Sequence, residues 1–176
     1  RRQRSIRPLL AAGFLLASTQ LAAAQTTFGP RLVLDSTMDS AYDTVAVDLN
    51  GDGRLDVAAV SQRDDQVAWF ENLGNGFFGK RIDITSALDR PVCIEAADLD
   101  ADGDMDLLVA SQGDNRITWL PNLGSGAFSF PRTVSTTSLG ARSACAADLD
   151  NDGDLDILAA SQDNDTIAWF ENLGSA

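Results

Sequence analysis

The sequence repeats itself at a fixed spacing of 50 residues. Three related segments, DLNGDGRLDVAAVSQ, DLDADGDMDLLVASQ and DLDNDGDLDILAASQ, begin at residues 48, 98 and 148. The same offset aligns three tryptophans (Trp69, Trp119 and Trp169) and three Asn-Leu-Gly triplets that begin at Asn72, Asn122 and Asn172. The repeat therefore covers whole structural units. Periods of about 20–50 residues are typical of solenoids, propellers and other arrays.

Each unit contains short apolar segments with the composition of β-strands. In the second unit they lie at residues 92–99, 105–112, 116–121 and 131–137. Clusters of Gly, Asn, Asp and Ser separate them and supply the backbone conformations that hairpin turns need. Four antiparallel strands in about 50 residues are typical of one blade of a β-propeller. The sequence thus predicts an all-β fold of about three β-propeller blades.

The repeats are divided at about residues 28–79, 80–129 and 130–176. The segment FGPRLVL from Phe28 aligns with FGKRIDI from Phe78, which predicts that the first repeat begins on an outer strand. Three blades are fewer than the four to eight of a closed propeller. We therefore expect a fragment of a larger ring. The alternative is that short chains assemble into one ring, with the N-terminal strand completing a blade from the C-terminus.

Residues 1–24 have the order of a secretory signal peptide. Four arginines come first, an apolar run follows from about Pro8 to Ala17, and the small residues Ala22 to Ala24 end the segment. The run is about half as long as the roughly 20 residues that a membrane-spanning helix needs. We therefore expect a mature chain of residues 25–176 that is secreted, extracellular or periplasmic, with no membrane span.

Charge and cysteine content exclude further classes of protein. Removal of the four N-terminal arginines changes the formal net charge from −13 to −17, which makes nucleic acid a poor partner. Cys93 and Cys145 are too few for a small disulfide-based fold, although an exported protein can form disulfides. We interpret them as two small buried residues.

The most specific motif is an acidic loop, Asp-x-Asp/Asn-x-Asp-Gly-x-x-Asp, present once in each repeat. Oxygen-bearing side chains stand at positions 1, 3, 5 and 9, and glycine at position 6 allows a sharp turn. Position 7 varies and is predicted to contribute its backbone carbonyl, so that the Arg54 side chain points away. The candidate metal ligands are Asp48, Asn50, Asp52, Arg54 and Asp56; Asp98, Asp100, Asp102, Asp104 and Asp106; and Asp148, Asp150, Asp152, Asp154 and Asp156.

These hard oxygen donors favour calcium. Ca²⁺ takes six to eight oxygen ligands, whereas zinc prefers Cys and His, and the chain has no histidine. An EF-hand does not fit, because its position-12 glutamate would fall on Ala59, Val109 and Ala159. Solvated acidic turns are the plain alternative, but the constant spacing argues against them. We expect about three calcium ions, one per repeat, with a structural role.

The motif and its spacing resemble the FG-GAP/VCBS repeat family, from about Phe28 to the end of the chain. The resemblance implies that each loop lies in the hairpin between the first two strands of a blade. It also implies a seven-bladed ring like that of the integrin α-subunit head. The first loop departs from the motif only at Asn50, a neutral oxygen donor. The Phe-Gly hallmarks are few, so the closer likeness is to VCBS repeats.

The repeated residues serve metal binding or packing, which favours a non-catalytic role in adhesion or in binding an extracellular protein or glycan. The resemblance implies a partner site at the edge opposite the acidic loops. The alternatives are part of a secreted carbohydrate-active enzyme, such as a polysaccharide lyase, or a structural spacer. The non-repeated polar residues suggest no catalytic constellation; they include Glu95, Arg142, Asp43, Tyr42 and Lys80. We expect the repeated tryptophans to pack between blades rather than to stack on sugars.

Overall fold

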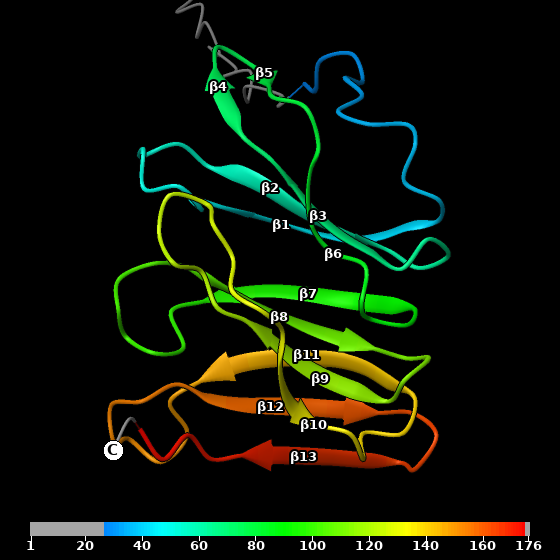
Figure 1. The fold of residues 1–176 in the computed structure, drawn as a ribbon, viewed down its shortest axis with the longest axis vertical. Coiled ribbons are helices and arrows are strands. Elements are labelled where there is room, and N and C mark those ends of the chain that lie inside the picture. The colour runs from blue at the N-terminus through cyan, green and yellow to red at the C-terminus, as the bar shows by residue number, and fades with distance from the viewer. Residues whose placement is uncertain (1–26, 175–176) are drawn as a thin grey trace, which may run out of the picture. The chain divides into compact units, whose positions relative to one another are not determined.

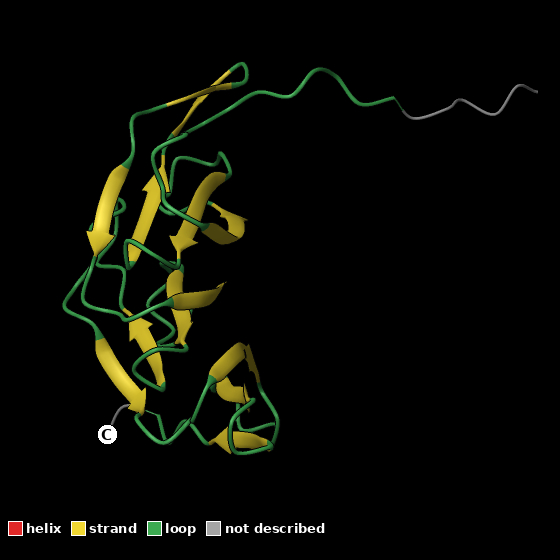
Figure 2. Cartoon of the chain, turned by 90° about the vertical axis from the view of Figure 1, so that its right-hand side faces the viewer, coloured by secondary structure: helices red, strands yellow, loops and turns green. Residues whose placement is uncertain are grey.

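The computed structural model describes residues 27–174, so the predicted signal peptide over residues 1–24 lies outside the described part. Residues from Val33 onward form one unit. Every regular element of the described residues is a β-strand, as Figures 1 and 2 show. None of these residues lies in a helix that is long and apolar enough to cross a membrane. The predicted all-β fold is confirmed.

Three antiparallel sheets follow one another along the chain (Figure 1). The first has the order β1 (Ala41–Val47), β2 (Asp56–Ser61), β3 (Gln66–Phe70) and β6 (Ile82–Thr85). The second has the order β7 (Pro91–Ala97), β8 (Asp106–Ser111), β9 (Arg116–Leu120) and β10 (Arg132–Ser135). The third contains β11 (Ala141–Ala147), β12 (Asp156–Ser161) and β13 (Thr166–Phe170). A small ribbon of β4 (Asn72–Gly74) and β5 (Phe77–Phe78) lies between β3 and β6.

The strand pairing repeats with the sequence. Val60 lies opposite Val67 in the first sheet, and the pairs Ala110 and Ile117, and Ala160 and Ile167, lie at the same place in the others. Each turn between the second and third strands has one residue with positive φ: Asp65, Asn115 and Asp165, with values of 56°, 61° and 51°. Asp and Asn tolerate this conformation better than most residues do. The turn residues therefore fix the same hairpin three times.

The core lies between neighbouring sheets. Successive residues of β8 point to opposite faces, so Leu107 and Val109 pack toward the first sheet while Leu108 and Ala110 pack toward the third. A strand covered on both sides is expected to be continuously apolar, and all six residues of β8 are buried. Trp69 and Trp119 pack within the two interfaces, as predicted, whereas Trp169 on the third sheet is half-exposed.

The outer strands differ from the expectation at one place. The first and second sheets each have four strands, while the third has three among the described residues. The segment from Phe28 to Leu34, predicted to be an outer strand, forms no strand within residues 27–174. An isolated strand has no stable form without a neighbour to accept its backbone hydrogen bonds.

The sheets and the sequence repeats are divided at different places. Each outer strand, β6 or β10, belongs to the same sheet as the three strands before it, whereas the repeats in the sequence are divided just ahead of this strand.

Both cysteines are free and partly buried. The Cys93 Sγ lies 3.7 Å from the Ala144 carbonyl oxygen, so this thiol points from β7 toward β11 of the third sheet. Burial is the main cause that raises the pKa of the Cys93 thiol. Cys93 thus serves as a small packing residue between the second and third sheets.

Candidate metal centres

Each acidic loop joins the first two strands of a sheet: β1 to β2, β7 to β8 and β11 to β12. The three loops occupy the same edge of their sheets, on the left in Figure 1. Position 9 of each loop is also the first residue of the second strand. One end of each candidate site is therefore anchored in the sheet, while the rest is a surface turn.

The second and third loops bring three carboxylates together. Ligand atoms of Asp98, Asp100 and Asp106 all lie within 4.8 Å of one another, and Asp148, Asp150 and Asp156 form the equivalent cluster. These are positions 1, 3 and 9 of the motif. Each cluster could hold a metal ion. Spacing in the sequence predicted these residues, because alternate positions of a tight turn face the same side.

Backbone amides hold the position-1 carboxylate in place. Asp98 accepts hydrogen bonds from the N–H groups of Asp102 and Gly103, at 3.1 and 3.0 Å. Gly103 has a φ of +94°, a conformation that favours glycine. A carboxylate oxygen that accepts one N–H keeps a further lone pair. The turn therefore orients the carboxylate without using up its capacity to bind a cation.

The position-9 carboxylate is fully buried in all three repeats. Asp106 accepts hydrogen bonds from the N–H groups of Leu99 and Asn122, at 3.1 and 2.8 Å. Burial nevertheless raises the pKa of Asp106 from 3.8 to about 6. In the third sheet, the N–H of Asn172 is the main cause that lowers the pKa of Asp156. The two differ because the second sheet is covered on both faces, whereas no described residue covers the outer face of the third.

The position-3 carboxylates are electrostatically crowded. Desolvation and the neighbouring carboxylates of Asp102 and Asp98 raise the pKa of Asp100. Desolvation and the carboxylate of Asp152 likewise raise the pKa of Asp150. A group whose neighbours disfavour its negative charge gains from a nearby cation. Both loops are therefore arranged so that a divalent cation relieves repulsion.

The first loop is different. Its position 3 is the neutral Asn50, so its carboxylates do not form a cluster of three. Hydrogen bonds, led by the one from the N–H of Gly53, lower the pKa of Asp48. The Arg54 guanidinium forms a salt bridge with Asp52, and its Nε donates to the Asn72 carbonyl oxygen at 2.5 Å. The Arg54 side chain thus extends toward the connection after β3, where Asp52 offers it a counter-charge.

Positions 5 and 7 lie outside the two clusters of three carboxylates. At position 5, Asp102 and Asp152 accept hydrogen bonds from the N–H groups of Asp104 and Asp154, at 2.9 and 3.0 Å. Each thereby stabilises the turn that follows the glycine. At position 7, the Asp104 carboxylate lies beside Gly124, where an added Cβ would come within 3.0 Å of its Oδ2. Its side chain is thus directed toward the connection after β9.

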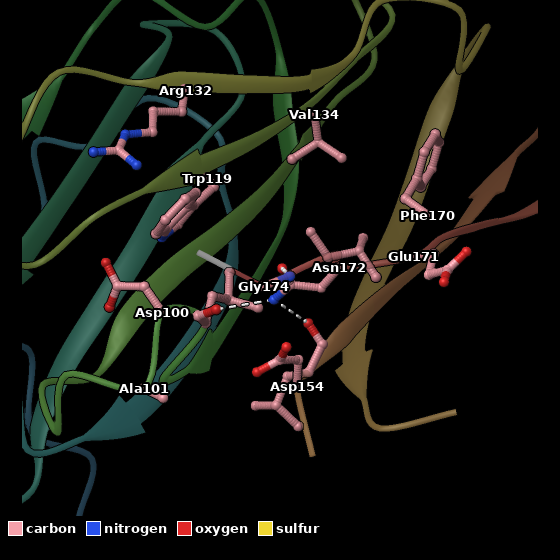
Figure 3. A pocket seen from close by; sticks show the side chains of 13 residues that line it. Asp100, Ala101, Trp119, Arg132, Val134, Asp154, Phe170, Glu171, Asn172 and Gly174 are labelled. Carbon is pink, nitrogen blue, oxygen red and sulfur yellow. Dashed lines mark hydrogen bonds between the residues drawn. The ribbon is translucent and has the colours of Figure 1, made fainter. Parts of the chain in front are cut away.

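Asparagine at the start of each Asn-Leu-Gly triplet was not predicted as a site residue. The Asn122 Nδ2 donates to the Met105 carbonyl oxygen at 3.0 Å and to the Leu49 carbonyl oxygen of the preceding loop at 2.9 Å. Asn172 repeats both bonds, to Leu155 and Leu99 at 3.1 Å (Figure 3). Neighbouring acidic loops are therefore directly linked. The signal in the sequence was the constant spacing of the triplet.

A groove of about 500 Å³ lies beside the second and third loops. Figure 3 shows Asp100 and Asp154 near one end and the side chains of Trp119, Arg132 and Phe170 farther along. The Arg132 guanidinium stacks over the Trp119 ring, 4.7 Å from its centroid. The groove thus combines an acidic end with an aromatic wall between the second and third sheets.

Antiparallel sheets of three or four strands, repeated in sequence and packed face to face, define a β-propeller-like repeat protein. The model of the FG-GAP-like repeat matches the chain twice, over residues 48–109 and 98–159. Together the two matches cover more than half of the chain, which belongs to the FG-GAP-like repeat family. Comparison with curated proteins gave no match.

The donor set fits a hard cation. The clustered side chains provide only carboxylate oxygens, and neither cysteine belongs to a cluster of potential ligands in the described part of the chain. Oxygen-only sites suit Ca²⁺ and Mg²⁺, whereas zinc and copper favour nitrogen or sulfur. Residues at positions 1, 3 and 9 would hold such an ion, and the ion would neutralise the crowded carboxylates.

Proposed function

We propose that this chain is a secreted, calcium-binding repeat protein that binds an extracellular protein or glycan and has no catalytic role. The observation that carries the proposal is the convergence of three carboxylates in the second and third loops. Repeats of this family often bind Ca²⁺. Each of the two loops contains five aspartates, whose mutual repulsion a divalent cation offsets.

Calcium is favoured over magnesium by the shape of the loop. Mg²⁺ demands near-ideal octahedral geometry, whereas Ca²⁺ accepts a larger and more flexible set of oxygens. The carboxylates here come from one short turn whose backbone amides already restrain Asp98 and Asp148. We propose three calcium sites, with the first weaker because Asn50 is neutral and Arg54 neutralises Asp52.

Thermal unfolding in EGTA, calcium or magnesium tests the proposal. Calcium at ten times the dissociation constant adds about 1.4 kcal/mol per independent site to the free energy of unfolding. We expect the melting temperature to rise in calcium and to rise less in magnesium. Asp98→Asn is expected to reduce the calcium-dependent rise, because Asp98 belongs to a carboxylate cluster.

Asp104→Asn is the matched control. It removes the same charge from the same loop, but Asp104 lies outside the cluster and keeps its backbone carbonyl. We expect this variant to retain most of the calcium-dependent rise. A melting temperature that is the same in EGTA and in calcium would contradict the proposed metal site.

The proposed partner site lies at the edge opposite the acidic loops. A groove of about 480 Å³ is present there, lined by Gln62, Arg63, Asp65, Asp89 and Arg90. The Arg and Asp side chains of this groove offer the donors and acceptors that sugar hydroxyls or polar peptides need. A protein and glycan array screened with calcium should give binding that Arg90→Ala weakens. Binding that is unchanged by Arg90→Ala would contradict this position.

A further inference from the structure

The chain contains two Asn-Gly pairs. Asn50 and Gly51 lie in the first acidic loop, and Asn75 and Gly76 lie between β4 and β5. Asparagine is a thermolabile residue. It loses its side-chain nitrogen as ammonia when the backbone nitrogen of the next residue attacks its Cγ atom. A following glycine obstructs that attack least, because it has no Cβ. Both pairs are therefore candidate sites of spontaneous deamidation.

In the first loop, the attacking nitrogen is held against a carboxylate. The Gly51 N–H donates to Asp48 Oδ1 at 2.8 Å. A backbone nitrogen must lose its proton as it bonds to Cγ, and an ionised carboxylate at hydrogen-bond distance is placed to accept that proton. Asp48 is thus positioned as the proton acceptor for this attack.

The same loop also holds the group that is attacked. The Asn50 Oδ1 accepts the Asp52 N–H at 3.1 Å. A donor on this oxygen stabilises the negative charge that develops there when nitrogen attacks Cγ. Asn50 is only partly buried and Gly51 is exposed, so water reaches the pair. The loop therefore provides a proton acceptor for the nitrogen and a donor for the carbonyl oxygen.

The second pair has no such partners among residues 27–174. Asn75 and Gly76 form the tip of the small ribbon, with φ values of 54° and 79°. No carboxylate of the described residues accepts the Gly76 N–H. The two glycines are equally open, since nothing lies within 4 Å of a Cβ added to Gly51 or Gly76. The pairs thus share their chemistry and differ in hydrogen bonding.

The other loops show that aspartate fits at the position of Asn50. Asp150, its counterpart in the third loop, accepts the N–H two residues later at 3.2 Å, just as Asn50 does. The residue that follows has a positive φ in all three loops: 74° for Gly51, 56° for Ala101 and 64° for Asn151. The turn therefore needs no rearrangement when the Asn50 amide becomes a carboxylate.

We propose that Asn50 is a deamidation site, and that the folded first loop promotes its conversion to aspartate. The Gly51 nitrogen bonds to the Asn50 Cγ, its proton passes through Asp48 to the departing amide nitrogen, and ammonia leaves. A succinimide ring remains. Water then adds to Cγ, the carbon whose oxygen the Asp52 N–H polarises, and the bond from Cγ to the Gly51 nitrogen breaks. The product is an aspartate on an unchanged backbone, and water is the only reactant consumed.

The conversion bears on the first candidate metal site. The second and third loops each bring together three carboxylates, at positions 1, 3 and 9. The first loop has Asp48 and Asp56 at positions 1 and 9, and the product supplies the carboxylate at position 3. This consequence for calcium rests on the proposed function, whereas the chemical conversion does not. The weakest of the three loops thus gains the full donor set as the protein ages.

Peptide mass spectrometry of the folded protein, incubated in EGTA at neutral pH, compares both pairs in one sample. We expect Asn50 to convert about ten times faster than Asn75, a modest part of what a positioned proton acceptor contributes. Aspartate should exceed isoaspartate, the product of ring opening at the backbone carbonyl. In urea the loop is lost, and the two pairs should convert at similar rates. Equal rates in the folded protein, the same excess in urea, or mainly isoaspartate would overturn the proposal.

Two variants test the role of the loop. Asp48→Asn keeps an oxygen at the Gly51 N–H but removes the charge that takes up the proton. Gly51→Ala obstructs the attack while preserving the turn, since Ala101 adopts the same positive φ in the second loop. We expect both variants to slow conversion of Asn50 and to leave that of Asn75 unchanged. Undiminished conversion of Asn50 in Asp48→Asn would refute the role assigned to the carboxylate.

The consequence for calcium has a separate test. Asn50→Asp mimics the product, and we expect its calcium-dependent rise in melting temperature to exceed that of the natural chain. Asn75→Asp is the matched control, because it adds the same charge outside the acidic loops. Equal rises in the two variants would refute the gain of a donor set. Conversion of Asn50 is measured by mass, so failure of the calcium site and failure of the deamidation are distinguishable.

Discussion

At the scale of single residues, Asn122 connects four parts of the molecule, three through its side chain and one through its backbone N–H. Its Nδ2 bonds to the carbonyl oxygens of Leu49 and Met105, and its Oδ1 accepts the N–H of Gly124 at 3.1 Å. Its own N–H donates to Asp106. Asn122 is 1% exposed, so the groups that it satisfies have no access to water if it is lost.

Asn122→Ala should therefore lower the free energy of unfolding by about 2–3 kcal/mol, the cost of leaving buried carbonyl groups without donors. Asn72→Ala is the matched control. The Nδ2 of Asn72 has one carbonyl partner, Leu55, and that bond is exposed. We expect a loss of about 1 kcal/mol or less for the control. Urea denaturation of both variants measures the difference, and equal losses would contradict the linking role of Asn122.

Residue spacing alone predicted some of these roles and not others. The acidic positions 1, 3 and 9 could be predicted, because alternation within a turn is a local property. The partner of the Arg54 side chain could not be predicted. Asp52 comes close enough to replace water around the guanidinium only once the loop is folded. The bond from Asn122 to Leu49 spans 73 residues, and no local rule connects such distant positions.

At the scale of elements, the connection after β9 carries an inter-sheet contact. Gly126 has a φ of +72°, and an added Cβ would lie 2.5 Å from the Trp69 ring. Gly76, at the same place in the first repeat, has a φ of +79° and nothing within 4 Å of an added Cβ. The two glycines thus share a backbone conformation but differ in their surroundings.

Gly126→Ala and Gly76→Ala separate these effects. Alanine at positive φ costs about 1 kcal/mol at either position. The clash with Trp69 should add roughly 1–3 kcal/mol at Gly126 alone. Chemical denaturation with tryptophan fluorescence follows both variants, and we expect a perturbed Trp69 signal only for Gly126→Ala. If the two variants lose the same free energy, the packing contact is negligible.

The strands themselves were accessible from the sequence. The segments predicted in the second unit, 92–99, 105–112, 116–121 and 131–137, correspond to β7, β8, β9 and β10 within a few residues. Turn clusters of Gly, Asn and Asp set their ends, and these are local signals. The segment at Phe28 has the same pattern but pairs with no strand among residues 27–174, so pattern alone did not decide whether it forms a strand.

At the scale of the whole molecule, the repeat predicted that sheets pack on one another but not which faces remain uncovered. Burial of Trp69 and exposure of Trp169 follow from the number of sheets on each side, although both residues occupy the same position of the repeat. The number of covering sheets also explains the different pKa values of two equivalent aspartates. Burial raises the pKa of Asp106 to about 6, whereas the pKa of Asp156 is lowered. Identical residues thus differ through their surroundings.

The hydrogen bonds from Asn122 and Asn172 to the preceding loops bear on how the number of repeats can change during evolution. Asn122 and Asn172 each bind the loop of the preceding repeat at the same offset. Gain or loss of one complete 50-residue unit in the gene therefore recreates every junction, since each new asparagine meets the same backbone carbonyl. A gain of any other length breaks that match. Duplication in whole units is thus the change to which this architecture is most tolerant.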